Sequence, residues 1–428
     1  MTALRALSTV FFASLAVACG GSVAGTDSDS GAAGSGTVTS DAGRVPVDSG
    51  QTQDDATSDS GVPFPAWHPP APQVISFGGA VLSPVKIVPV FYAGDPLQSK
   101  VEQMLQQLPQ SSYWTAISKE YGVGSMTIAT SIVLNEAAPT KIDDSEIAAW
   151  LAQKADGTHA PWPKAELQQM FAVFYPASTV ITLQNSQSCY GFGAYHNESV
   201  VDGINFAYGV MPRCGGGGQL GPIDYLTVAL SHEIVEAATD PYVQSSPAYQ
   251  AVDFDHYTWS FFPGGEVADM CTYERQANQQ LVGSFYVQRS WSNQSAKASH
   301  DPCVPALSQP YFNSAPDLKD TVKIGFGGGS VSTKGAKIPV GQSKTIDVYL
   351  FSDAPTSAWS VDATDAATLQ GQSAELSFSW DKTSGQNGDV LHLTIKALKA
   401  SNYGISLFVL RSQQGGGAEH LWYGTVGN

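Results

Sequence analysis

The segment LSHEIVEAATDP, residues 230–241, places a histidine and two glutamates where they can act on one ion. His232 and Glu236 are four residues apart, so on a helix they lie about 40° apart around the axis and point the same way. Glu233 lies about 100° from His232, where its carboxylate can reach a water molecule without coordinating the ion. A metal ion lowers the pKa of bound water, and a neighbouring carboxylate can accept the proton. The spacing therefore predicts a metal site with Glu233 as general base; the alternative is a solvated acidic helix face.

The helix that carries these side chains has a recognisable beginning and end. Pro222 follows Gly221 and suits the first helical position, whereas Pro241 disfavours helix at Asp240. About 18 residues fit between the two prolines, or roughly 27 Å of helix. Apolar residues give the helix a side that we expect to be internal: Leu226, Ala229, Leu230, Ile234 and Ala237. An unpaired charge on an internal helix is costly, which favours a metal-binding role over a solvated face.

The HE pair resembles the zincin metallopeptidases, whose short motif is HExxH. The resemblance implies that His232 is the first zinc ligand, that Glu233 is the general base, and that the substrate is a peptide or protein. The sequence departs from the motif because Glu236 stands where the family has its second histidine. A carboxylate is an accepted zinc ligand, but it lowers the Lewis acidity of the site, so manganese and calcium stay open beside zinc.

The zincins take a third ligand from downstream, and one branch adds a nearby acidic residue that holds the first histidine. Here the segment GGEVADMC, residues 264–271, contains Glu266 and Asp269 three positions apart. The resemblance implies that one of them is the third ligand and that the other orients His232. We favour Asp269 as the ligand. Asp240 is a further candidate, although the sequence TDP is more economically interpreted as a turn that ends the helix.

Two more histidines are weaker candidates. His196, in CYGFGAYHNE, precedes a predicted strand at residues 204–212 and could be a ligand or a hydrogen-bond donor in the transition state. His256, in DFDHYTW, has less support than His196. Serine catalysis is not indicated, because no GxSxG motif occurs and Ser231 has no evident triad.

Five segments together resemble a broader group of secreted bacterial proteins that are distantly similar to the plant EXORDIUM, or phosphate-induced, proteins. The segments are GGAVLSPVKIVPVFYAG, SSYWTAISKEYG, SCYGFGAYHNE, SHEIVEAATDP and GGEVADMC, which run from Gly78 to Cys271, under half the chain. Members of the group share an HE-x-x-E helix followed by an acidic pair and a cysteine. The resemblance implies the same arrangement here, but it assigns no agreed enzymatic activity.

The N-terminus has the pattern of an export signal. Arg5 precedes an apolar run at residues 6–17, which is too short to span a bilayer, and AVAC then ends at Cys19. This ending resembles a bacterial lipobox, which implies that residues 1–19 are a lipoprotein signal peptide and that Cys19 is lipidated. The alternative is an ordinary cleaved signal. We therefore expect an exported protein that is anchored to a membrane or at the cell surface.

The remaining cysteines fit an oxidising compartment. Without Cys19 four are left, and three pairings are possible. Proximity in the sequence favours disulfides between Cys189 and Cys214 and between Cys271 and Cys303. A four-thiolate zinc site is disfavoured because no CxxC pair occurs.

Charge and composition exclude one class of partner. The chain has 38 acidic and 21 basic residues with no cluster of lysine and arginine, so nucleic acid is not expected to bind. Residues 20–62 are almost entirely Gly, Ser, Ala, Thr and Asp, which predicts a disordered linker. Nothing in the sequence indicates the oligomeric state.

The rest of the chain predicts two folded domains. Residues 63–310 mix apolar strands with amphipathic helices, which predicts an α+β domain with a zincin-like mixed sheet and an active-site helix. Its expected strands are 77–94, 125–134, 169–176 and 204–212, and its expected helices are 95–108, 113–121, 143–155 and 222–239. Residues 311–428 contain short alternating segments split by Gly, Asp and Ser, which predicts an all-β sandwich.

Two functions are compatible with these features. The leading hypothesis is an exported surface lipoprotein with a zinc-dependent peptidase domain, in which the edge of the strand at 204–212 receives an extended substrate. The alternative is a non-catalytic cell-surface binding or adhesion lipoprotein with a structural metal or no metal. Metal content and the effect of Glu233→Gln on hydrolysis would separate them.

Overall fold

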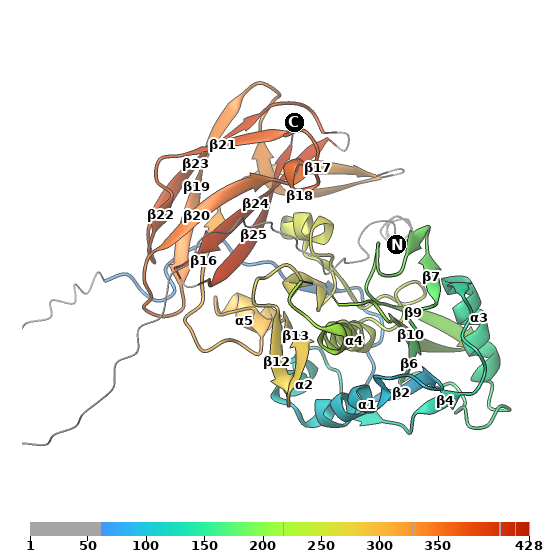
Figure 1. Cartoon of the computed structure of the whole chain (residues 1–428). Helices are drawn as coiled ribbons and strands as arrows, with labels where there is room; N and C mark the ends of the chain where they lie inside the picture. The colour runs from blue at the N-terminus through green and yellow to red at the C-terminus, as the bar shows by residue number, and fades with distance from the viewer. Residues whose placement is uncertain (1–60, 217, 327–328, 402–403, 416, 428) are drawn as a thin grey trace, which may run out of the picture.

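The structure is a computed structural model and describes residues 61–216, 218–326, 329–401, 404–415 and 417–427. The predicted signal peptide, Cys19 and nearly all of the predicted linker lie outside the described residues. The chain forms an α/β part and a C-terminal part made of strands, which Figure 1 shows beside each other. None of the helices in the described residues combines the length and apolar character that a bilayer span requires.

The α/β part is built on a six-stranded sheet with the order β3-β2-β6-β10-β9, to which β4 adds by pairing with β2. Its strands are β2 (Val85–Tyr92), β3 (Met126–Ile128), β4 (Ile132–Leu134), β6 (Gln169–Tyr175), β9 (Tyr195–Val201) and β10 (Ile204–Pro212). All are parallel except β9, which runs antiparallel to β10. The expectation that β10 offers a free edge is wrong, because β6 and β9 occupy both of its sides.

Helices cover both faces of this sheet. One face packs on α1 (Gln98–Gln107), α2 (Ser112–Ser118) and α4 (Pro222–Thr239), and the other packs on α3 (Asp144–Lys154). Successive side chains of β10 therefore point to opposite faces of the sheet. Ala207 and Met211 pack in the apolar cluster on the side of α1, α2 and α4, whereas Phe206 and Tyr208 pack in the cluster on the side of α3. The result is three layers, with α4 packed beside β9 and β10.

The expected strand at residues 125–134 is instead two strands, β3 and β4, and Pro89 explains the break. Val85 donates its N–H to the carbonyl oxygen of Ser125, and the carbonyl oxygen of Ile87 accepts from the N–H of Ala129. Every second residue of β2 therefore directs its backbone N–H and C=O toward the segment that contains β3 and β4. Pro89 faces the same way but has no N–H, and the pairing resumes only at Val90. The expected strand at 77–94 is likewise shorter, because β2 begins after Pro84.

Smaller pairings support loops around the sheet. They are β1 (Val74–Ser76) with β11 (Tyr249–Val252), β12 (Asn278–Val282) with β13 (Phe285–Gln288), β14 (Ser290–Trp291) with β15 (Cys303–Val304), and β5 (Lys141–Asp143) with β7 (Val180–Leu183), which also pairs with β8 (Ser186–Gln187). Short helices complete this part: η2 (Leu108–Gln110), η3 (Phe254–Phe261), η4 (Asp269–Cys271) and α5 (Asn293–Lys297).

Both predicted disulfides are present. Cys189 pairs with Cys214 and Cys271 pairs with Cys303. The first joins the loop before β9 to the end of β10, and the second joins η4 to β15. Each bond therefore fixes a segment that carries a candidate site residue to a neighbouring strand.

The C-terminal part consists of two sheets that face each other, as expected for a sandwich. One sheet contains β16 (Phe312–Pro316), β19 (Ser343–Ser352), β21 (Leu376–Trp380) and β23 (Val390–Ala397); the other contains β17 (Asp320–Phe326), β18 (Gly329–Lys337), β20 (Trp359–Asp365), β22 (Ser384–Gly385), β24 (Ile405–Gln413) and β25 (Glu419–Gly427). Phe312 lies against Trp359 across the interior, and Phe378 lies against Phe408. One short helix, α6 (Ala366–Leu369), interrupts the strands.

The sandwich is not attached by a single linker. Trp259 on η3 packs against Trp422 and Tyr423 of β25, with ring centroids 5.9 and 4.7 Å away. Glu274 accepts hydrogen bonds from His420 Nδ1 and from the N–H of Leu421, both at 3.1 Å. One apolar cluster runs without a break from the central sheet into both sheets of the sandwich. The two parts therefore share a core.

Candidate functional site

Helix α4 forms where the sequence predicts it and is almost wholly buried. It spans Pro222–Thr239, with Gly221 as its N-cap and Asp240 as its C-cap. Fourteen of its eighteen residues are buried, including His232, Glu233 and Glu236, which are 8%, 5% and 3% exposed. The solvated-face alternative is thus excluded for these three side chains, and each must find compensation inside the protein.

His232 belongs to a group of three that we call the first triad, with Glu236 and Asp269. His232 Nε2 lies 3.0 Å from Glu236 Oε1 and 3.6 Å from Asp269 Oδ1. Its other ring nitrogen, Nδ1, lies 3.1 Å from Gln288 Oε1 on β13. Gln288 Nε2 donates to the carbonyl oxygen of Ala268 at 2.7 Å, which orients the amide. Nδ1 therefore carries the hydrogen, and Nε2 turns its lone pair toward the carboxylates when the ring is neutral.

His196 belongs to a second group, the second triad, with Glu233 and Glu236. His196 Nδ1 lies 3.4 Å from Glu233 Oε2 and 3.5 Å from Glu236 Oε2. Its Nε2 lies 3.2 Å from the carbonyl oxygen of Asp240. This oxygen accepts the ring hydrogen and so orients the imidazole of His196, as Gln288 Oε1 does for His232. His196 reaches α4 because it pairs with Gly209 of β10 and so faces the helix side of the sheet.

Asp269 is held in the first triad by a close turn of the backbone. The N–H of Asp269 donates to Glu236 Oε1 at 3.2 Å, and the N–H of Gly265 donates to Asp269 Oδ2 at 3.2 Å. Gly264 has φ +119°, and a Cβ at that position would lie 1.8 Å from Asp269 Oδ2. The two glycines therefore let the backbone wrap closely around this carboxylate.

Glu266 and Asp240 complete the cluster on the side of His196. Glu266 Oε1 lies 3.7 Å from His196 Nε2, so the acidic pair is divided, with Asp269 at His232 and Glu266 at His196. Asp240 Oδ1 accepts from the N–H of Ala248 at 2.5 Å, which fits the expected turn at the end of the helix. Asp240 Oδ2 and Glu266 Oε1 are buried without a nearby N–H or O–H donor, and Glu266 is close enough to Asp240 to influence its pKa.

Burial and mutual charge shift the pKa values of six groups in this cluster. Burial lowers the pKa of each histidine, but the nearby carboxylates outweigh it, so both pKa values stand well above the usual one. Burial raises the pKa of Glu236, yet the charge of His232 brings it down to about 2. Burial, followed by the charge of Glu236, raises the pKa of Glu266 and Asp269 well above the usual range. Burial also raises the pKa of Asp240 to about 6, despite the hydrogen bond from Ala248.

Five carboxylates surround the two histidines: Glu233, Glu236, Asp240, Glu266 and Asp269. Among the described residues, no lysine or arginine forms an ion pair with any of them within 4.0 Å. The cluster is not sealed, because the side chains of Glu266 and Asp269 are 18% and 14% exposed. Two imidazoles and several carboxylates are the donor set of zinc and manganese sites. The residues therefore fit a divalent ion that enters from the side of Glu266 and Asp269.

Other candidates lie elsewhere or have structural roles. His256 is paired with Asp253, its Nδ1 lying 2.9 Å from Asp253 Oδ1, and does not belong to either triad. Ser231 donates to the carbonyl oxygen of Val228 and accepts the N–H of Gln288, which explains its burial without a catalytic role. Gln288 was not predicted, because a single glutamine on a short strand carries no signal until β13 is seen to pack on α4.

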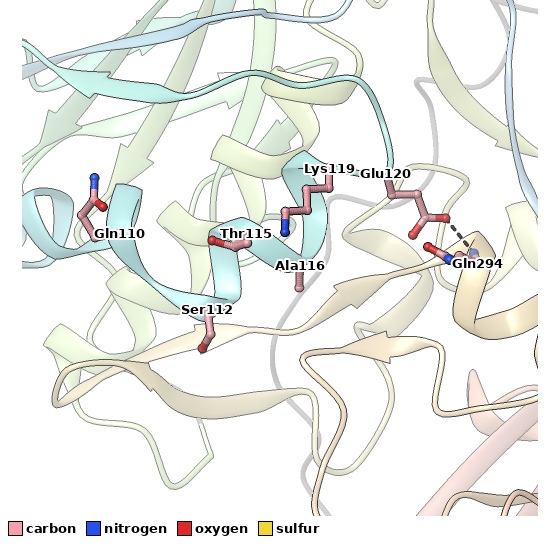
Figure 2. A pocket seen from close by; sticks show the side chains of 7 residues that line it. All are labelled: Gln110, Ser112, Thr115, Ala116, Lys119, Glu120 and Gln294. Atoms are coloured by element: carbon pink, nitrogen blue, oxygen red, sulfur yellow. Dashed lines mark hydrogen bonds between the residues drawn. The ribbon is translucent and has the colours of Figure 1, made fainter.

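A surface depression on α2 is separate from the cluster. It is lined by residues that include Ser112, Thr115, Lys119 and Gln294 (Figure 2). Glu120, at its end, accepts a hydrogen bond from the N–H of Gln294 at 2.7 Å and another from Ser292 Oγ, so it supports the start of α5. Glu120 therefore has a structural role, and none of the lining residues belongs to a triad.

Comparisons with known proteins assign no family. No family model matches the chain, and no curated protein matches it. Among solved structures, the surface layer protein SbsC, domains 4–9, is 14% identical and covers 26% of this chain and 14% of that chain, with a TM-score of 0.17. The titin M3 domain is 10% identical and covers 28% of this chain and 94% of that chain, with a TM-score of 0.16. A Bacteroides ovatus GH5 xyloglucanase is 10% identical and covers 22% of this chain and 17% of that chain, with a TM-score of 0.15. Similarities this weak carry no argument about function.

Proposed function

We propose that this chain is an exported metal-dependent peptidase, anchored through a lipid on Cys19, whose α/β part is a zincin-like domain. One observation carries the proposal: buried imidazoles and carboxylates converge around α4, and no lysine or arginine of the described residues forms an ion pair with them. His232, Glu236 and Asp269 would hold the ion, with zinc as the leading candidate. Gln288 would orient His232 from behind.

A bound divalent ion would supply a Lewis acid for the scissile carbonyl and lower the pKa of water. Glu233 would take a proton from the attacking water as the new carbon–oxygen bond forms, and would return it to the leaving nitrogen as the peptide bond breaks. Its placement supports this role. Glu233 Oε2 faces His196 rather than His232, so Glu233 does not take a ligand position in the first triad. An extended substrate would approach by the outer edge of β9, which pairs only with β10 among the described strands.

The test is to measure metal content and peptide hydrolysis for the purified chain and for Glu233→Gln. The wild type is expected to retain divalent metal and to cleave an unstructured protein, with the new termini identified by mass spectrometry. Glu233→Gln should keep at least one ion and lose about 10²- to 10⁴-fold in rate, the usual contribution of a general base. Glu102→Gln, on α1 and outside both triads, is the matched control. A wild type that binds no metal would refute the proposal.

A second function is supported by the low exposure of the cluster. Glu233 is only 5% exposed, and a bound ion at such a site can serve stability alone. The chain would then be a non-catalytic surface-binding or adhesion lipoprotein with a structural metal. In that case Glu233→Gln would leave ligand binding unchanged, and no hydrolysis would be found in the wild type. Metal removal would lower the melting temperature in both cases, so only the hydrolysis assay separates the two functions.

A further inference from the structure

We propose that this site takes two divalent cations of the zinc or manganese type, with Glu236 as the carboxylate that bridges them. The inference rests on the proposed metal site and adds its stoichiometry. The first triad would hold one ion through His232 and Asp269, and the second triad would hold the other through His196, with Glu233 beside that ion as the base of the proposed reaction. Glu236 is the residue that the two triads share.

The two oxygens of Glu236 point to different histidines. Oε1 lies 3.0 Å from His232 Nε2, whereas Oε2 lies 3.5 Å from His196 Nδ1. The N–H of Asp269 donates to Oε1, which fixes how the carboxylate is turned. A carboxylate in this position can bind one ion through each oxygen, as in two-metal sites whose ions lie about 3.5–4 Å apart.

A single ion does not account for the positions of both histidines. Each triad has its ligand atoms within 4.8 Å of one another, but within the described residues no such group contains both His196 and His232. Each ring is nevertheless positioned as a ligand. His232 Nδ1 faces Gln288 Oε1 and His196 Nε2 faces the Asp240 carbonyl, so the remaining nitrogen of each ring faces its own carboxylates.

The charge of the cluster also favours two ions. Its five carboxylates are Glu233, Glu236, Asp240, Glu266 and Asp269. When all are ionised, one divalent ion leaves three negative charges in a mostly buried site, and a second ion leaves one.

The test is the number of ions bound by the full chain. After metal is stripped with a chelator, the wild type is expected to bind two Mn²⁺ per chain, with an electron paramagnetic resonance spectrum of a coupled pair. His196→Gln is expected to bind one Mn²⁺ and to show the spectrum of an isolated ion. Asp269→Asn should do the same by losing the other ion, so the result does not depend on one variant. His256→Gln, outside both triads, is the control and should still bind two.

The possible outcomes separate this inference from the proposed function. A wild type that binds one Mn²⁺, unchanged in His196→Gln, overturns the two-ion site and leaves a single-ion peptidase standing. A wild type that binds none overturns both. Thermal melting of each variant identifies any that fails to fold, and the count is taken only from variants that melt cooperatively.

Discussion

The orientation of each histidine depends on a residue outside the triads. Gln288 is 2% exposed and is held at three points: its backbone N–H bonds Ser231 Oγ, its Nε2 bonds the Ala268 carbonyl, and its Oε1 faces His232 Nδ1. Such contacts fix the tautomer and direction of a ligating ring. His232 would otherwise be free to rotate its Nε2 away from Glu236.

Replacing Gln288 by leucine tests this positioning role. Gln288→Leu keeps most of the volume but removes the acceptor for His232 Nδ1, and we expect zinc affinity to fall about 10- to 100-fold. The measurement is competition with a chromogenic chelator. Gln169→Leu is the matched control, because Gln169 is also fully buried but hydrogen-bonds Glu166 instead. Equal losses of affinity in both variants would mean that the effect is only loss of stability.

At the scale of elements, the cluster depends on η4 staying against α4. Asp269 and Cys271 lie on this short helix, and the disulfide to Cys303 closes a loop whose ends are 32 positions apart. Trp291 of β14 donates its backbone N–H to the Val267 carbonyl, which holds the same segment from the other side. The other backbone–backbone hydrogen bonds of η4 are local, within residues 266–274, so the disulfide is its covalent tie to β15.

Removal of this disulfide should weaken both folding and metal binding. Replacing Cys271 and Cys303 together by serine is expected to lower the free energy of unfolding by about 2–4 kcal/mol, mainly through the unfolded chain. Because Asp269 is two positions away, zinc affinity should fall as well. Chemical denaturation and chelator competition measure the two effects. The double replacement of Cys189 and Cys214 is the comparison, and it should affect stability without displacing Asp269. An unchanged zinc affinity in the first variant would show that the glycine turn alone holds Asp269.

The helix of the site follows from local sequence signals, whereas Asp269, Glu266 and His196 could be named only as candidates because their distance from the helix is not encoded locally. Proline and glycine mark both ends of α4 locally, and the spacing of His232 and Glu236 follows from helix geometry alone. The place of His196 depends on its pairing with Gly209 across a sheet, which no local pattern encodes. The break between β3 and β4 similarly depends on a proline in a different strand. Strand register between distant segments therefore decides whether the candidate residues meet in one cluster, and a single sequence does not reveal that register.

At the scale of the whole molecule, the sequence indicated two domains but not how they are joined. Alternation predicted the sheets of the sandwich, whereas the aromatic residues between the two parts resemble any other core residues in the sequence. The N-terminal strap, residues 63–73, adds a second connection. Ala66 donates its N–H to Asn387 on the sandwich side, His68 stacks on Phe351, and His68 Nε2 lies 2.8 Å from Ser299 Oγ of the α/β part. The sandwich is thus built into the α/β part from both ends of the chain.

A shared core means that the α/β part should not survive without the sandwich. A chain ending at residue 310 would expose Trp259 and its neighbours, so we expect it to aggregate and to lose cooperative melting, whereas the full chain should melt in one transition.

Trp422→Ala tests the same interface in the full-length chain. Trp422 is 3% exposed, and its replacement should lower the free energy of unfolding by about 3–5 kcal/mol. Tyr190→Ala is the control, since Tyr190 of the α/β part is 82% exposed and its loss should change little. Size-exclusion chromatography measures aggregation, and calorimetry measures the cooperativity and temperature of unfolding. A truncated chain that stays monomeric, melts sharply and binds zinc like the full chain would show that the two parts fold independently, and the interface would then only orient the site rather than sustain it.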